Sequence, residues 1–144
     1  KPTLVKQGQA RLGEQVVRPD VSAASRTMLR RVVTEGTASF GDVAGYAVGG
    51  KTGTADKPRP NGGYYNDRTI TTFASVFPAH DPKYVLVVTL DEPVETTGPK
   101  PRRSAGWTAV PVAAEVIRRV APLLGLRPEV EPADPLGIVL TSSE

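Results

Sequence analysis

Hydrophobic residues recur with two different spacings along the chain, and these spacings predict helices and strands. Apolar positions three or four residues apart predict a helix over residues 21–35, ending at Gly36, with Asp20 as its N-cap. The same spacing predicts a second helix that begins after Thr108 and ends or kinks near Pro122. Stretches rich in β-branched and aromatic residues predict strands over 46–55, 69–77 and 84–90.

The connections between these stretches predict an α+β fold. A short turn at 78–82 separates the last two strands, so we expect them to pair as an antiparallel hairpin. The strand at 84–90 is almost wholly apolar and is expected to be central, with both faces buried. Residues 57–67 are rich in Pro, Gly and Asn and are predicted to form a loop, whereas residues 16–17 are predicted to form a short strand. The prediction is an antiparallel sheet with flanking helices, one before and one after it.

Composition narrows the class of protein. Hydrophobic residues make up 39% of the chain and charged residues 23%, which is typical of a soluble globular domain. The net charge of +3 is spread along the chain, so nucleic-acid binding is not expected. The absence of cysteine excludes a disulfide scaffold and a cysteine zinc site. We expect neither a metal nor an organic cofactor.

The densest group of candidate functional residues lies at 48–55, which reads VGGKTGTA. On a strand, Thr52 and Thr54 point to the same face, because alternate side chains share a face. Gly53 between them lets another chain approach the backbone. Lys51 adds a positive charge, although strict alternation places it on the opposite face. Such a surface suits a carboxylate or an extended peptide.

Residues Gly45–Thr52 also fit the phosphate-binding pattern G-x-x-x-x-G-K-[ST], which would make the chain a nucleotide-binding module. That pattern needs a hydrophobic strand before it and a helix after it. The residues before Gly45 form no such strand, and the Pro- and Gly-rich residues after Thr52 cannot begin a helix. A non-catalytic interaction domain is the other alternative.

The motif and the strands that follow it resemble those of penicillin-binding protein transpeptidases. Lys51, Thr52 and Gly53 match the K-T-G triplet, within a longer G-K-T-G-T-A form. The strand-like residues 72–79 and 84–88 and the helical residues 28–36 are similar to the elements around that triplet in the family. The resemblance covers about residues 15 to 125 and is nearest to the class B, cell-division type. It implies part of a β-lactamase/transpeptidase-like fold, with residues 1–125 as the C-terminal portion of a transpeptidase domain. Residues 126–144 are Pro-rich and are expected to form a loose tail, whose apolar residues 136–140 can dock.

The resemblance also implies a role for each residue of the motif. Lys51 is expected to support proton transfer near the catalytic serine. Thr52 and Thr54 are expected to bind the terminal carboxylate of a peptidoglycan stem peptide or of a β-lactam, and Gly53 to let the substrate lie against the strand. The backbone N–H of Thr54 is expected to form half of the oxyanion hole.

The family's nucleophile is missing from this chain. None of its serines is followed by lysine at the third position or by asparagine at the second, so neither S-x-x-K nor S-x-N is present. If the resemblance holds, the acylating serine lies upstream, and the chain alone is expected to be inactive. The parent enzyme is expected on the periplasmic face of the bacterial inner membrane, anchored by a segment absent from this chain, with other cell-wall or division proteins as partners.

Overall fold

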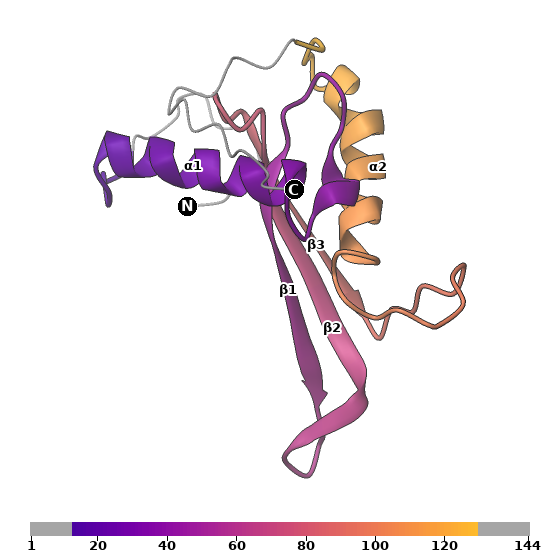
Figure 1. The fold of residues 1–144 in the computed structure, drawn as a ribbon. Helices are drawn as coiled ribbons and strands as arrows, with labels where there is room; N and C mark the ends of the chain where they lie inside the picture. The colour runs from indigo at the N-terminus through magenta and orange to yellow at the C-terminus, as the bar shows by residue number, and fades with distance from the viewer. Residues whose placement is uncertain (1–12, 130–144) are drawn as a thin grey trace, which may run out of the picture.

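The computed structural model describes residues 13–129, which form one antiparallel sheet with helices against it (Figure 1). In the described part of the chain, strands β1, β2 and β3 are hydrogen-bonded in sequence order, and both pairs are antiparallel. The predicted meander between two helices is therefore confirmed. The elements, in chain order, are α1 (Pro19–Thr34), the 3-10 helix η1 (Ser39–Gly41), β1 (Gly49–Pro58), β2 (Tyr64–Phe77), β3 (Tyr84–Asp91) and α2 (Ala109–Leu123).

The core lies between the sheet and α2, with Phe73 of β2 at its centre. Phe73 is fully buried, as are Val110 and Ile117 of α2. Strand β1 approaches this ring closely because Gly50 has no side chain; a Cβ at Gly50 would lie 2.6 Å from the Phe73 ring. Helix α1 packs against the start of β1, on the side away from α2 in Figure 1.

The register of β1 against β2 decides which way the candidate residues point. Thr52 lies opposite Phe73, and Thr54 lies opposite Thr71. Because directly opposed residues of an antiparallel pair share a face, both threonines lie on the face that carries the core. By the same alternation, Lys51 lies on the other face.

Two predicted strand features are wrong. Within residues 13–129, β3 is an edge of the sheet rather than a central strand, and its side chains alternate between half-buried and exposed. Val85 is 71% exposed, whereas Leu86 beside it packs against the core, because α2 covers only one face. The predicted loop at 57–67 shrinks to residues 59–63, since β1 and β2 pair as far as Pro58 and Tyr64 and project as a long hairpin (Figure 1).

Smaller differences concern the helix ends and residues 16–17. Asp20 is not the N-cap of α1; Arg18 takes that position, and Asp20 lies in the first turn, where it pairs with the Arg18 guanidinium. Thr108 is the N-cap of α2, as predicted. Pro122 is accommodated in the last turn, and α2 ends at Leu123. Residues 16–17 are exposed and form no strand.

The first residues of the predicted tail lie against the body. The N–H of Leu126 donates to the carbonyl of Ala121, and the N–H of Glu129 donates to the carbonyl of Gly45. The predicted docking of residues 136–140 stays a prediction, because these residues lie outside the described part of the chain.

Candidate functional site

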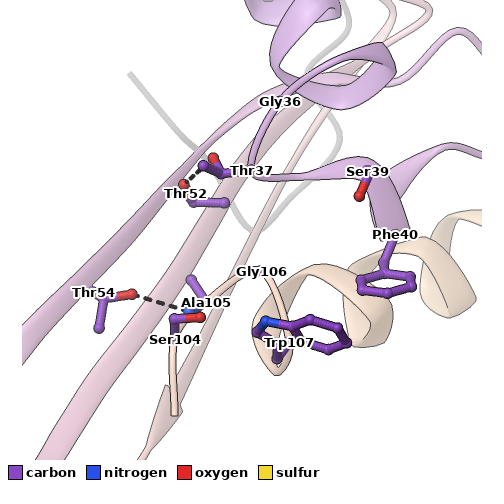
Figure 2. A pocket seen from close by; sticks show the side chains of 10 residues that line it. All are labelled: Gly36, Thr37, Ser39, Phe40, Thr52, Thr54, Ser104, Ala105, Gly106 and Trp107. Carbon is purple, nitrogen blue, oxygen red and sulfur yellow. Dashed lines mark hydrogen bonds between the residues drawn. The ribbon is translucent and has the colours of Figure 1, made fainter. Parts of the chain in front are cut away.

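Thr52 and Thr54 border an open hollow beside strand β1 (Figure 2). Its volume is about 420 Å³, and its walls come from three places in the chain: strand β1, the connection from α1 through η1, and the loop between β3 and α2. Thr52 is half-buried and Thr54 is exposed, so both hydroxyls are accessible to solvent. The lining residues are Gly36, Thr37, Ser39, Phe40, Thr52, Thr54, Ser104, Ala105, Gly106 and Trp107.

Each of the two threonine hydroxyls is in contact with a polar group of a neighbouring segment. The Oγ1 of Thr52 lies 3.0 Å from the Oγ1 of Thr37, and either atom can be the donor. The Oγ1 of Thr54 accepts the backbone N–H of Ala105 at 3.0 Å. Both contacts are drawn as dashed lines in Figure 2. They tie β1 to the two loops that form the rest of the hollow.

Two aromatic side chains, Phe40 and Trp107, line the hollow opposite the strand, and Arg102 stacks on Trp107. The ring of Trp107 lies against Phe40 of η1, with 4.9 Å between ring centroids. The guanidinium carbon of Arg102 lies 3.6 Å from the Trp107 ring centroid, close enough for a cation–π interaction. Glu95 forms two backbone hydrogen bonds with Arg102 and an ion pair at 3.6 Å. The β3–α2 loop therefore has its own internal contacts.

Hydrogen bonds also lower the pKa of a carboxyl group in this loop. The hydroxyl of Thr97 and then its backbone N–H donate to Glu95, and with the charge of Arg102 they hold the pKa of Glu95 below its ordinary value. Glu95 is consequently charged at neutral pH and can remain paired with Arg102.

Lys51 is exposed and is not one of the residues that line the hollow. Its Nζ donates to the backbone carbonyl of Thr52 at 2.8 Å, so the side chain bends back along its own strand. The ammonium group thus lies near the edge of β1, although its Cα–Cβ bond points to the face away from Thr52.

Gly53 lies in an open part of the strand. A Cβ placed there would meet no atom nearer than 3.9 Å, the carbonyl oxygen of Thr72. In the sheet of the described residues, β1 is an edge strand, so its outer backbone groups are not paired with another strand. An extended peptide can therefore approach Gly53 along this edge.

The sequence reasoning did not identify Thr37 or the loop residues Ser104 and Ala105. They lie in irregular segments, where side-chain periodicity gives no direction. Trp107 packs against Phe40 and Arg102. Its position in the wall of the hollow could not be predicted.

The phosphate-binding alternative does not fit the local structure. Lys51 and Thr52 lie inside strand β1, which continues to Pro58, so no helix begins after the motif. The residues before Gly45 form the 3-10 helix and turns rather than a strand. The backbone amides therefore cannot wrap a phosphate at a helix N-terminus.

Neither a metal-ligand cluster nor a membrane-spanning helix is found in the described part of the chain. Among residues 13–129, no three His, Asp or Glu side chains come together as metal ligands. Over the same residues, no helix has the length and apolarity needed to cross a lipid bilayer.

The antiparallel sheet with helices against it, whose edge strand carries Lys-Thr-Gly-Thr, matches part of solved transpeptidase domains and is part of a β-lactamase/transpeptidase-like fold. Residues 1–118 match the penicillin binding protein transpeptidase domain, and the chain belongs to that family, in its class B branch.

Similar proteins come from several bacteria. The chain is 36% identical over 127 residues to the probable peptidoglycan D,D-transpeptidase FtsI of Caulobacter vibrioides. This match covers 83% of this chain and 22% of the relative. It matches the solved transpeptidase domain of Burkholderia pseudomallei penicillin-binding protein 3 with a TM-score of 0.72 and 31% identity, covering 88% of this chain and 37% of that one. The Mycobacterium tuberculosis penicillin-binding protein 3 complexed with ampicillin matches with a TM-score of 0.62 and 31% identity, over 77% and 25% of the two chains. The chain thus spans about a fifth of the first of these relatives.

Proposed function

We propose that this chain supplies the substrate-binding and oxyanion wall of a serine D,D-transpeptidase that cross-links peptidoglycan. The observation that supports it best is the pair of accessible hydroxyls, Thr52 and Thr54, on one face of an edge strand beside an open hollow. In this proposal residues 1–125 are the C-terminal portion of the transpeptidase domain and residues 126–144 are a tail. The enzyme acts on the periplasmic side of the membrane, with other cell-wall or division proteins.

The two hydroxyls bind the terminal carboxylate of a D-Ala-D-Ala stem peptide. A hydroxyl donates one hydrogen bond, and a bond to a charged acceptor contributes about 1.5–3 kcal/mol. The N–H of Thr54 is directed at the oxygen of the scissile carbonyl, where negative charge develops during acyl transfer. Gly53 leaves room for the peptide along the strand, and Lys51 supplies positive charge at its edge.

The reaction needs a serine from another part of the protein. The serine Oγ attacks the carbonyl carbon of the penultimate D-Ala, and its proton passes to the departing terminal D-Ala. An amine of a second stem peptide then takes the acyl group and releases the serine. A β-lactam enters the same site, because its carboxylate and strained amide resemble the peptide end; the M. tuberculosis relative has been solved with ampicillin.

The test is acylation of the full-length protein by a fluorescent penicillin. Thr52→Val and Thr54→Val keep the side-chain volume and remove the hydroxyl. Each should lower the second-order acylation rate about 10- to 100-fold, as expected for a lost hydrogen bond to a charged group. Thr27→Val is the matched control, because the Thr27 hydroxyl donates to the Ala23 carbonyl within α1 and Thr27 does not line the hollow. Unchanged rates in both variants would contradict the proposal.

The same reagent tests the assignment of the nucleophile. The 144-residue chain contains no Ser-x-x-Lys sequence, so incubation with the penicillin should give no covalent adduct in intact-mass spectra. An adduct on this chain would show that it contains an acylating residue after all.

A further inference from the structure

Thr37 contacts the candidate carboxylate site but has no role in the function proposed above. Its Oγ1 lies 3.0 Å from that of Thr52, and both residues line the hollow (Figure 2). Thr37 comes from the connection between α1 and η1, 15 positions before Thr52 in the sequence. The two hydroxyls are therefore brought together only by the fold.

Contacts of the neighbouring backbone hold Thr37 in place. Its neighbour Ala38 is fully buried, and the Ala38 N–H donates to the carbonyl of Val32 at the end of α1. On the other side, a Cβ at Gly106 would lie 2.5 Å from the Thr37 carbonyl oxygen, so the β3–α2 loop touches this backbone. The backbone at Thr37 and Ala38 thus contacts two other segments, while the exposed Thr37 side chain faces Thr52.

The proton arrangement of the two hydroxyls has a consequence for anion binding. Two hydroxyls have two protons, and the hydrogen bond between them uses one. If Thr37 donates to Thr52, the proton of Thr52 is available for an anion. In the opposite arrangement, the proton of Thr52 is occupied by Thr37. The direction of this bond therefore decides whether Thr52 can donate to a carboxylate.

Thr54 offers a useful comparison. The backbone N–H of Ala105 can only donate, so the Thr54 hydroxyl must accept it and its own proton is free. A hydroxyl that accepts a hydrogen bond also becomes a better donor, because chains of hydrogen bonds polarise one another. If Thr37 donates, the Thr52 hydroxyl accepts a hydrogen bond just as the Thr54 hydroxyl does. The hydroxyl protons of Thr52 and Thr54 can then both be donated to one anion.

From this geometry we infer that Thr37 is a positioning residue, which donates to Thr52 and so directs the Thr52 hydroxyl proton toward the substrate carboxylate. The inference rests on the proposed function, because it assigns Thr52 to a carboxylate. Thr37 itself does not touch the reacting atoms. Its effect should therefore appear in the binding of the carboxylate and not in the acylation step that follows.

The test compares Thr37→Val with Thr37→Ser in the full-length protein. Thr37→Val removes the donor and should raise the dissociation constant of the non-covalent penicillin complex about 3- to 10-fold, as for the loss of one neutral hydrogen bond. The first-order acylation constant should change less than about twofold, and Thr37→Ser should restore tight binding. With the penicillin methyl ester, which has no carboxylate, Thr37→Val and the parent protein should react alike. Thr34→Val is the matched control, because the Thr34 hydroxyl bonds the Arg30 carbonyl of its own helix.

Three results would separate this inference from the proposed function. If Thr52→Val weakens binding and Thr37→Val does not, the role of Thr37 is wrong and the proposed function stands. If Thr37→Val slows the reaction with the penicillin and the reaction with its methyl ester equally, Thr37 has only a structural role and the inference is again wrong. If neither Thr52→Val nor Thr54→Val has an effect, the proposed function itself fails. Melting temperatures accompany each variant, and Thr37→Ala replaces Thr37→Val if the latter does not fold.

Discussion

At the scale of single residues, two glycines of strand β1 should respond differently to the same substitution. A Cβ at Gly50 would lie 2.6 Å from the Phe73 ring and 2.7 Å from the Ala74 carbonyl oxygen. Gly50→Ala should therefore reduce the free energy of unfolding by about 1–3 kcal/mol, the usual cost of overpacking a core. At Gly53 the nearest atoms are 3.9 and 4.0 Å away, so Gly53→Ala should leave stability unchanged or slightly raised.

The Gly53 variant also tests the proposed path of the substrate. If a peptide lies against this strand, the added methyl group should slow penicillin acylation of the full-length protein while its melting temperature is kept. The melting temperature and the acylation rate are measured for both Gly50→Ala and Gly53→Ala. Equal destabilisation by both substitutions would contradict the close approach of β1 to Phe73. Unimpaired acylation in Gly53→Ala would exclude contact of the substrate at this position.

The sequence allowed some site residues to be predicted and not others, for a physical reason. The shared face of Thr52 and Thr54 follows from strand alternation alone, and the structure confirms it. Thr37 lies in a connection with no periodicity, so its direction depends on how α1, η1 and the β3–α2 loop pack together. Lys51 is an intermediate case: alternation gave its face, but the bend of its side chain to the Thr52 carbonyl could not be predicted.

At the scale of elements, the β3–α2 loop should loosen at acid pH. Hydrogen bonds from Thr97, assisted by Arg102, hold the pKa of Glu95 below its ordinary 4.5. A lowered pKa in the folded state stabilises the fold above the ordinary pKa, and this contribution is lost as the pH falls through the lowered value. The window therefore lies below pH 4.5. Because Arg102 lies between Glu95 and Trp107, protonation of Glu95 should change the surroundings of the indole.

Trp107 is the single tryptophan of the 144 residues, so its fluorescence reports this loop directly. Its emission should shift below pH 4.5, and Glu95→Gln should show the shifted emission already at neutral pH. Asp81→Asn is the matched control: the pKa of Asp81 is also lowered, by Lys83, but it lies in the turn at the other end of β3. Identical titrations of the Glu95 and Asp81 variants would contradict the role given to Glu95.

Element boundaries were predicted less well than element types, and the errors have identifiable causes. The residues at 57–67 looked like a loop because of their prolines and glycines, yet strand pairing with β2 extends β1 to Pro58. Near the C-terminal end of β1, Lys57 forms ion pairs with Asp91 and Glu92, both at 2.7 Å, and these join β1 to the end of β3. These contacts link residues 34 and 35 positions apart, so local composition could not reveal them.

At the scale of the whole molecule, β3 is an apolar strand with one uncovered face. Leu86 and Val88 pack toward the core, whereas Val85 and Val87 are 71% and 57% exposed on the face away from α2. In the described residues the outer edge of β3 also pairs with no strand. Continuous apolar runs are typical of strands buried on both faces, so the sequence of β3 suits a more complete sheet than the described residues form. This explains why the predicted burial of both faces was wrong for this structure.

We expect the rest of a transpeptidase domain to cover this face of β3. This chain occupies 37% of the solved B. pseudomallei transpeptidase domain, so most of such a domain lies outside the match. We therefore predict that Val87→Lys lowers the melting temperature of the full-length protein, because a charge placed against apolar packing is destabilising. In the 144-residue chain alone, the same substitution should reduce self-association, measured by light scattering, since it makes an exposed apolar face polar.

Val94→Lys is the matched control for this prediction. Val94 is 42% exposed but lies after the end of β3, in the β3–α2 loop. The same change there should have little effect on the melting temperature of the full-length protein or on self-association of the chain. A full-length protein that tolerates Val87→Lys as well as Val94→Lys would show that this face of β3 remains exposed to solvent. In that case the apolar sequence of β3 would need another explanation, because the face of β3 that carries Val87 would contribute nothing to the stability of the domain.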